Sequence, residues 1–160
     1  MKTLIIFLML YSSLYCFSQN LRTAEEVKYF NKEFIRLLNI ERKKLNLDTL
    51  IESDKLNKSS MNWSRECIIR TKFEHSDLRN IDINAECLDL GISNLPVEDA
   101  VQVVIESFKS SESHWELLMS NDYKYVGASE YVKQTYMTIS IGSIHTREFR
   151  THSVTTVHLK

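Results

Sequence analysis

The spacing of hydrophobic residues changes along the chain, and this change most limits the folds that it can adopt. Over residues 24–45, 53–70 and 96–108, apolar side chains recur every three or four positions, as on one face of an amphipathic helix. Over residues 137–141 they alternate with polar side chains, as along a half-buried strand. Helices that come first and strands that come last predict an α+β domain with an antiparallel sheet.

Local signals mark where the predicted elements begin. Thr23 and Glu26 have the spacing of a capping box, Ser53 can cap a second helix, and the fixed φ angle of Pro96 suits the first turn of a third. We expect one or two further helical turns over residues 114–119. The predicted strands are 81–90, 125–131, 137–141 and 154–159, with 125–131 and 137–141 forming a hairpin. In the first strand, Ala85 and Cys87 point inward and Glu86 points the other way.

Glycine and proline are scarce, which excludes two large classes of nucleotide enzyme. The 160 residues include 3 Gly and 1 Pro. Neither a G-x-G-x-x-G dinucleotide loop nor a phosphate-binding P-loop can be formed with glycines only at positions 91, 127 and 142. The few glycines instead fall near predicted element boundaries, with Gly142 closing the strand 137–141.

Residues 1–19 have the pattern of a secretory signal peptide. Lys2 precedes seven unbroken apolar residues, Leu4 to Leu10, and polar residues follow. A membrane-spanning helix needs about 20 apolar residues, whereas this run is broken at Ser12. We therefore expect a domain of residues 20–160 that is secreted or lies in the periplasm or cell envelope, with no membrane span after signal cleavage.

Charge and cysteine content limit the partners and the covalent links. The net charge is −1 and no basic cluster is present, so we expect no nucleic-acid partner. Cys67 and Cys87 remain once the leader is removed. In an exported protein they can form a disulfide, which would contribute roughly 3 kcal/mol by closing a short loop. Two buried free thiols are the alternative.

Among the five histidines, His75 and His114 stand out because each lies at a predicted helix boundary. The other three lie in a polar, threonine-rich tail and carry little functional weight: His145, His152 and His158. The sequence lacks the motifs of the common zinc enzymes and the G-x-S-x-G elbow of serine hydrolases. Cys67 lies on an apolar helix face, where burial raises the pKa of a thiol and makes it a poor nucleophile. The pattern alone predicts that both boundary histidines are partly buried and hydrogen bonded locally.

The order of several short motifs is more specific than any one of them. The motifs are L-N-I-E-R at 38–42, L-N-L-D-T-L at 45–50, S-D-K-L at 53–56, F-E-H-S at 73–76, A-E-C at 85–87, S-F-K-S-S-E-S-H at 107–114 and Y-V-G-A-S at 125–129. Together they resemble the CAP superfamily of cysteine-rich secretory, antigen 5 and pathogenesis-related 1 proteins, and its compact bacterial members in particular. The resemblance covers residues 31–142.

The resemblance implies a single-domain α-β-α sandwich with a small antiparallel sheet and a central cleft lined by histidines and acidic residues. His75, Glu86 and His114 match the family's cleft residues. Ser111 stands where animal members carry a second glutamate, and Phe108 stands where tryptophan is usual.

Two imidazoles and one carboxylate can supply three ligands of a divalent metal such as zinc, so His75, Glu86 and His114 are a candidate metal set. Hydrolysis also needs a general base near the bound water, and Ser111 cannot serve as one. We therefore favour a secreted, non-enzymatic domain that binds a small lipid-like or envelope-derived ligand, or a protein partner, at the cleft. A metal-dependent hydrolase of peptide or cell-envelope substrates and a structural module of the cell surface are the alternatives.

Overall fold

The computed structural model describes residues 21–78, 82–92, 95–141 and 144–160, without the side chains of Ile92 and of residues 135–150. The predicted leader and Gly142 lie outside the described residues. The described part contains helices α2 (Ala24–Lys44), α3 (Asp54–Ile69), α4 (Val97–Ser110) and α5 (Glu112–Leu118), and strands β1 (Ile51–Glu52), β2 (Ala85–Ile92), β3 (Tyr125–Ile141) and β4 (Ile144–Leu159).

The predicted helices are confirmed, and their ends agree closely with the sequence signals. Thr23 and Glu26 form the expected capping box at the start of α2: the Thr23 hydroxyl accepts from the Glu26 N–H, and the Glu26 carboxylate accepts from the Thr23 N–H. The hydroxyl of Ser53 accepts from the Leu56 N–H at the start of α3. Pro96 directly precedes α4.

The predicted hairpin between residues 125–131 and 137–141 is wrong, because both segments belong to the single strand β3. Its partner is β4, which pairs antiparallel with β3 from Val126 opposite Leu159 to Ile141 opposite Ile144. Residues 132–136 are Val-Lys-Gln-Thr-Tyr and include none of the Gly, Pro, Asn or Asp residues that favour tight turns. Polar residues interrupt the apolar alternation there, but the strand continues through them.

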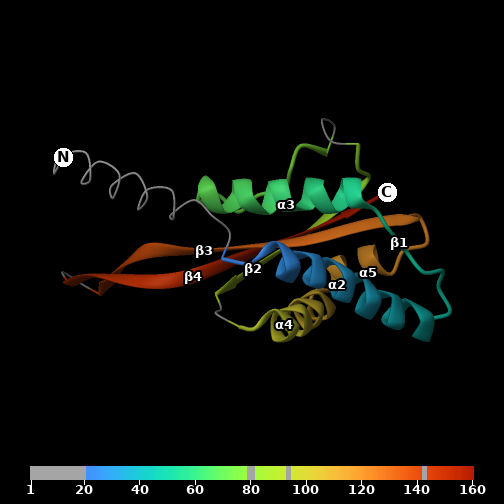
Figure 1. Cartoon of the computed structure of the whole chain (residues 1–160), viewed down its shortest axis with the longest axis horizontal. Helices are drawn as coiled ribbons and strands as arrows, with labels where there is room; N and C mark the ends of the chain where they lie inside the picture. Colours follow the sequence, from blue (N-terminus) through green and yellow to red (C-terminus); the bar gives the residue numbers. More distant parts are fainter. Residues whose placement is uncertain (1–20, 79–81, 93–94, 142–143) are drawn as a thin grey trace, which may run out of the picture.

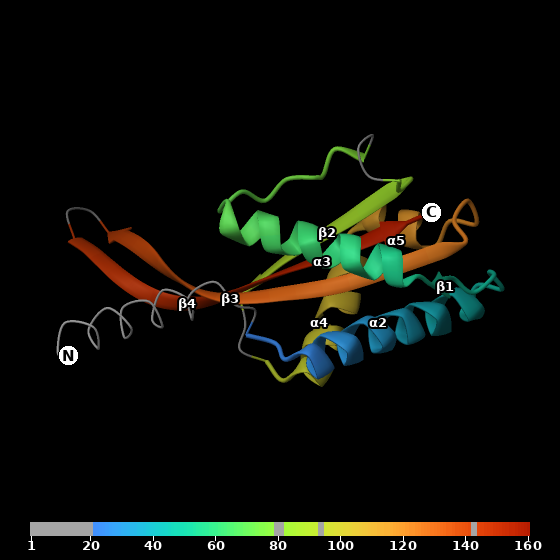
Figure 2. The same cartoon turned by 45° about the horizontal axis from the view of Figure 1, so that its top comes forward.

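The sheet lies between two helical layers, which confirms the α-β-α sandwich (Figure 1). The strand order is β1-β3-β4-β2. The pairs β3–β4 and β4–β2 are antiparallel, while β1 is parallel to β3, so the sheet is mixed instead of fully antiparallel. Helix α3 covers one face, here named the α3 face, and α2, α4 and α5 cover the other, named the α4 face. The far ends of β3 and β4 project beyond the helices (Figure 2).

The register places side chains in rows that face one layer or the other. Two apolar rows face α2 and α4 and belong to the main core: Val126–Leu159–Ala85 and Ala128–Val157–Cys87. Between them, the row Gly127–His158–Glu86 faces α3. The parity of β2 is therefore as predicted, with Ala85 and Cys87 in the main core and Glu86 on the opposite face.

Helix α3 packs close to the sheet because small residues line its inner side. The Ser60 hydroxyl donates to the Gly127 carbonyl at 3.0 Å, and the Ser64 hydroxyl contacts the Ser129 carbonyl and the Thr156 hydroxyl. A Cβ atom at Gly127 would lie 2.2 Å from the backbone nitrogen of Asn57. Only glycine fits this position without separating α3 from the sheet.

A buried arginine joins α2 to the chain around α5. The Arg42 guanidinium is almost fully buried and donates to the carbonyls of Asp48, Leu118 and Ser120 at 2.7–2.8 Å. The bonds to Leu118 and Ser120 satisfy carbonyl groups at the end of α5 and just after it, which have no partner within the helix.

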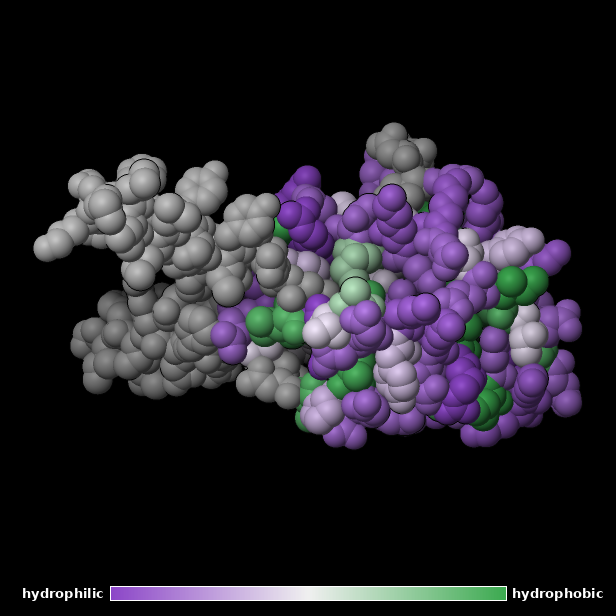
Figure 3. All heavy atoms as spheres, viewed as in Figure 1, coloured by the Kyte–Doolittle hydropathy of each residue, from purple (hydrophilic) through white to green (hydrophobic). Residues whose placement is uncertain are grey.

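The outer surface of the described residues is mainly hydrophilic on the face that Figure 3 shows. Hydrophobic side chains form separate spots there and no continuous patch. None of the described helices is long and apolar enough to span a membrane.

Candidate functional site

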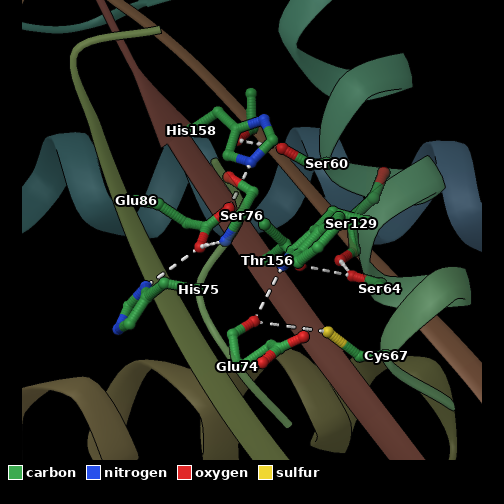
Figure 4. A network of polar contacts seen from close by, with 12 residues as sticks. Ser60, Ser64, Cys67, Glu74, His75, Ser76, Glu86, Ser129, Thr156 and His158 are labelled. Atoms are coloured by element: carbon green, nitrogen blue, oxygen red, sulfur yellow. Dashed lines mark hydrogen bonds and ion pairs between the residues drawn. The ribbon is translucent and has the colours of Figure 1, made fainter. Parts of the chain in front are cut away.

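Glu86 lies at the centre of a polar cluster on the α3 face (Figure 4). One carboxylate oxygen, Oε1, accepts from the Ser76 N–H at 2.9 Å and lies 2.9 Å from His75 Nδ1. The other oxygen, Oε2, lies 2.9 Å from Nε2 of His158. We refer to His75, Ser76, Glu86 and His158 as the Glu86 cluster.

Three separate parts of the chain build the Glu86 cluster. Strand β2 is an edge strand and carries Glu86, and the register of β4 places His158 directly opposite it. His75 and Ser76 come from the segment that follows α3. The carbonyl of Glu74 fixes this segment, because it accepts from Trp63 Nε1 at 3.1 Å and from Cys67 Sγ at 3.7 Å.

The carboxylate of Glu86 is buried but strongly stabilised in its charged form. The exposed fraction of its side chain is 1%. Burial alone raises the pKa of a carboxyl group, but hydrogen bonds from His158 and Ser76 together outweigh burial and lower the pKa of Glu86. At neutral pH the group is therefore an ionised acceptor, and the chain's own donors engage both of its oxygens.

The two histidines of the cluster differ in their access to solvent. The His75 side chain is 61% exposed, and its second ring nitrogen points away from Glu86 (Figure 4). His158 is fully buried, and its Nδ1 has no hydrogen-bond partner. Because a buried N–H without an acceptor is costly, this favours the tautomer of His158 that carries its hydrogen on Nε2 and donates it to Glu86.

His114, the other expected cleft histidine, lies on the α4 face and does not join the Glu86 cluster. Its ring packs edge-on against Phe108, with 5.5 Å between the ring centroids, and its carbonyl lies 4.0 Å from Cys87 Sγ. Ser111 lies between α4 and α5 and makes no side-chain capping bond to α5. The structure thus brings His75 and Glu86 together, while His114 and Ser111 lie in the other layer.

The structure does not bring the candidate metal ligands His75, Glu86 and His114 together. His75 and Glu86 lie on one face of β2 and His114 on the other, and both Glu86 oxygens already accept hydrogen bonds. Across the described ranges, no three His, Cys, Asp or Glu side chains are grouped so that they could hold a metal ion.

The disulfide expected between Cys67 and Cys87 does not form, since both are free thiols. Cys67 packs with Ile68, Tyr131 and Val154 on the α3 face, whereas Cys87 belongs to the main core. The sheet separates the two thiols. The alternative, two buried free cysteines, is what the structure shows.

Sequence reasoning missed His158, to which it gave little weight because of its polar, threonine-rich surroundings. A usable signal was present in the predicted strand 154–159. Val157 and Leu159 are the apolar residues on either side of His158, so alternation places His158 on the face opposite to theirs. Glu86 has the same relation to Ala85 and Cys87, which suggests that the two side chains can share a face.

One family model and several solved structures match this chain. The sequence profile of the CAP family, described as the cysteine-rich secretory protein family, matches residues 35–138. Comparison with curated protein sequences finds no significant match.

Solved structures share the fold at low sequence identity. An outer surface protein of Borrelia burgdorferi is 17% identical with a TM-score of 0.55, and the match covers 89% of this chain and 97% of that one. A cysteine-rich secretory protein of Staphylococcus aureus is 17% identical with a TM-score of 0.59, covering 88% of this chain and 41% of that one. An extracellular protein of Bacillus anthracis with an SCP domain is 14% identical with a TM-score of 0.56, covering 87% and 44%. The chain thus spans less than half of the last two proteins.

Proposed function

The chain belongs to the cysteine-rich secretory protein family, and we propose that it is an exported, non-catalytic domain that binds a ligand where His75 is exposed. The outer-surface and extracellular descriptions of two structural relatives support export. The pattern of residues 1–19 supports it independently.

The observation that carries the proposal is the engagement of Glu86 by donors from the chain itself. A carboxylate that acts as general base or metal ligand needs a free lone pair directed at the reacting group. Here Oε1 receives the Ser76 N–H and contacts His75, and Oε2 contacts His158. Three of the roughly four lone-pair sites of the carboxylate are thus used within the chain, and the side chain is 1% exposed, so Glu86 acts as an anchor for the segment that carries His75.

His75 is suited to recognition because it is both exposed and held in place. The contact with Glu86 fixes the ring through Nδ1 and leaves the second nitrogen directed outward (Figure 4). A fixed ring loses less conformational entropy on binding than a free one. The outward nitrogen can exchange a hydrogen bond with a polar group of a small lipid-like or envelope-derived molecule, or of a protein partner.

The proposal can be tested by NMR titration of the isotopically labelled protein with two probes, lauric acid and muramyl dipeptide. Wild-type protein should show saturable chemical-shift changes of the amides near His75 and Glu86 with at least one of the two probes. Native mass spectrometry of the purified protein identifies any ligand that co-purifies, and that ligand should shift the same amides. We expect the variant His75→Ala to weaken binding about tenfold. The variant His114→Ala is the matched control on the other face and should bind like wild type.

Two results would contradict the proposal. Equal binding by wild type and His75→Ala would place the ligand elsewhere. Hydrolysis of a peptide or muropeptide substrate by wild type, abolished in His75→Ala, would show that the domain is an enzyme.

A further inference from the structure

A second buried polar group lies on the α4 face of the sheet. In the register, Thr155 of β4 lies between Asp89 of β2 and Glu130 of β3. Directly opposed residues of neighbouring strands share a face, and this row directly follows the apolar row Ala128–Val157–Cys87. We refer to Asp89, Thr155 and Glu130 as the acidic row.

Burial of the acidic row costs free energy, because it contains two carboxyl groups and an unpaired hydroxyl. Glu130 is 3% exposed and Thr155 is fully buried, and the Thr155 hydroxyl has no hydrogen-bond partner. Asp89 is partly buried and accepts from the Ser107 hydroxyl of α4. Burial is the main cause that raises the pKa of both carboxyl groups, and the negative charge of Asp89 raises that of Glu130 further.

The first described residues of the chain are fastened to this row. Arg22 Nε donates to Glu130 Oε2 at 2.9 Å, and Arg22 Nη1 donates to the Leu95 carbonyl at 2.9 Å. Beside it, the Leu21 N–H donates to the Val132 carbonyl of β3 at 2.8 Å. We refer to Leu21 and Arg22 as the N-terminal latch.

We propose that the N-terminal latch is acid-sensitive: a proton taken up by Glu130 removes a buried negative charge that holds Arg22, and residues 21–22 then loosen from β3. The Arg22 side chain is only 11% exposed, so its positive charge has lost most of its hydration. When Glu130 is neutral, the ion pair no longer offsets this loss, and the guanidinium moves toward water. Because the pKa of Glu130 is raised, this happens above the pH at which an exposed glutamate titrates.

The other charged groups around the row set the pH of the transition. Asp89 favours protonation of Glu130, while Arg22 opposes it. Glu26 of α2 lies 4.0 Å from Arg22 Nη1 and gives the guanidinium a second, more exposed partner. His114 of α5 acts one step removed, because its charge lowers the pKa of Asp89.

Amide hydrogen exchange of the N-terminal peptide, read by mass spectrometry between pH 7.5 and 4.5, tests the proposal. Rates are divided by those of the same peptide free in solution, so that the intrinsic pH dependence cancels. We expect protection of Leu21 and Arg22 in wild type to fall several-fold as the pH falls, while β2 and α2 stay protected. In Asp89→Asn the midpoint should move to lower pH, because a charge that favours protonation of Glu130 is lost.

Two further variants keep the proposal open to refutation. In Glu130→Gln, the amides of residues 21–22 should be weakly protected at every pH. Arg22→Gln should behave in the same way, and it replaces Glu130→Gln if that variant does not fold. Glu25→Gln, at an exposed position in the same region, is the control and should behave like wild type. Constant protection of residues 21–22 down to pH 4.5 in a folded wild type would overturn the proposal, as would an unchanged midpoint in Asp89→Asn.

Discussion

At the scale of single residues, Glu86 joins three parts of the chain through one carboxylate. It connects the segment after α3, the edge strand β2 and the last strand β4. A buried charge is tolerated only where hydrogen bonds replace its hydration, and this cluster provides them from His75, the Ser76 backbone and His158. The same contacts define the direction in which His75 faces solvent.

The variant Glu86→Gln should lower the free energy of unfolding by about 1–3 kcal/mol at pH 7, because an amide cannot accept from all three donors. The lowered pKa of Glu86 means that its ionisation stabilises the fold above the ordinary glutamate value of 4.5. This contribution is lost as the pH falls below that value. Urea unfolding at pH 7 and at pH 3.5 should therefore show a larger difference between variant and wild type at pH 7.

The exposed residue Glu116, changed to Gln, is the matched control and should have little effect at either pH. An equal difference at both pH values for Glu86→Gln would show that the charge of Glu86 does not contribute to stability.

Arg42 has a structural role of the same kind with the opposite charge. The variant Arg42→Met keeps the apolar stem but leaves three carbonyl groups without a donor, which should cost about 3 kcal/mol in chemical denaturation. Lys43→Met, one position along the same helix and exposed, should change stability by less than about 0.5 kcal/mol. Equal effects of the two substitutions would contradict the role given to Arg42.

At the scale of the elements, the contact between α3 and the sheet depends on small side chains. Gly127→Ala should destabilise by about 2–3 kcal/mol, since the new Cβ would meet the backbone of Leu56 and Asn57. Gly91→Ala is the comparison: its Cβ would meet the Ser153 hydroxyl, a side-chain atom instead of backbone, so the cost should be lower, about 1 kcal/mol. Thermal unfolding of both variants checks the order, and a larger effect at Gly91 would contradict it.

The elements also show which parts of the fold could be predicted from sequence. Helices α2, α3 and α4 were predictable because period and capping residues are local signals that agree with each other. The length of β3 was not predictable. Its middle contains polar residues, and without knowledge of the pairing strand such a segment looks like a loop. The parallel pairing of β1 depends on a contact with β3 over 70 residues away, for which its two residues give no signal.

For the candidate site, the predictable part was the pairing of His75 with Glu86. The placement of His114 was not predictable from the motifs, since it depends on which face of the sheet α5 covers. That choice is made by packing, including the contact between Phe108 and His114. His158 was missed because its role depends on the register between β2 and β4.

At the scale of the whole molecule, two layers enclose a sheet that separates the two cysteines. Burial raises the pKa of the Cys87 thiol to about 12, and it also raises that of Cys67. In the folded protein, a thiol-specific reagent should therefore react slowly with both, and in denaturant it should modify both. The melting temperature should not change when a reductant is added. A mass two hydrogens lower than that of the dithiol, or a reductant-dependent loss of stability, would show that a disulfide exists.

The central claim is that Glu86 anchors His75 on one face of β2, while His114 belongs to the other face and the two histidines do not share a ligand. Long-range proton–nitrogen NMR spectra of the imidazole rings, recorded before and after one equivalent of zinc chloride, test it most directly. We expect Glu86→Gln to shift the ring nitrogens of His75 and His158 but not those of His114, and zinc to cause no joint shift of His75 and His114. Simultaneous coordination shifts of His75 and His114 at one zinc per chain would contradict the claim.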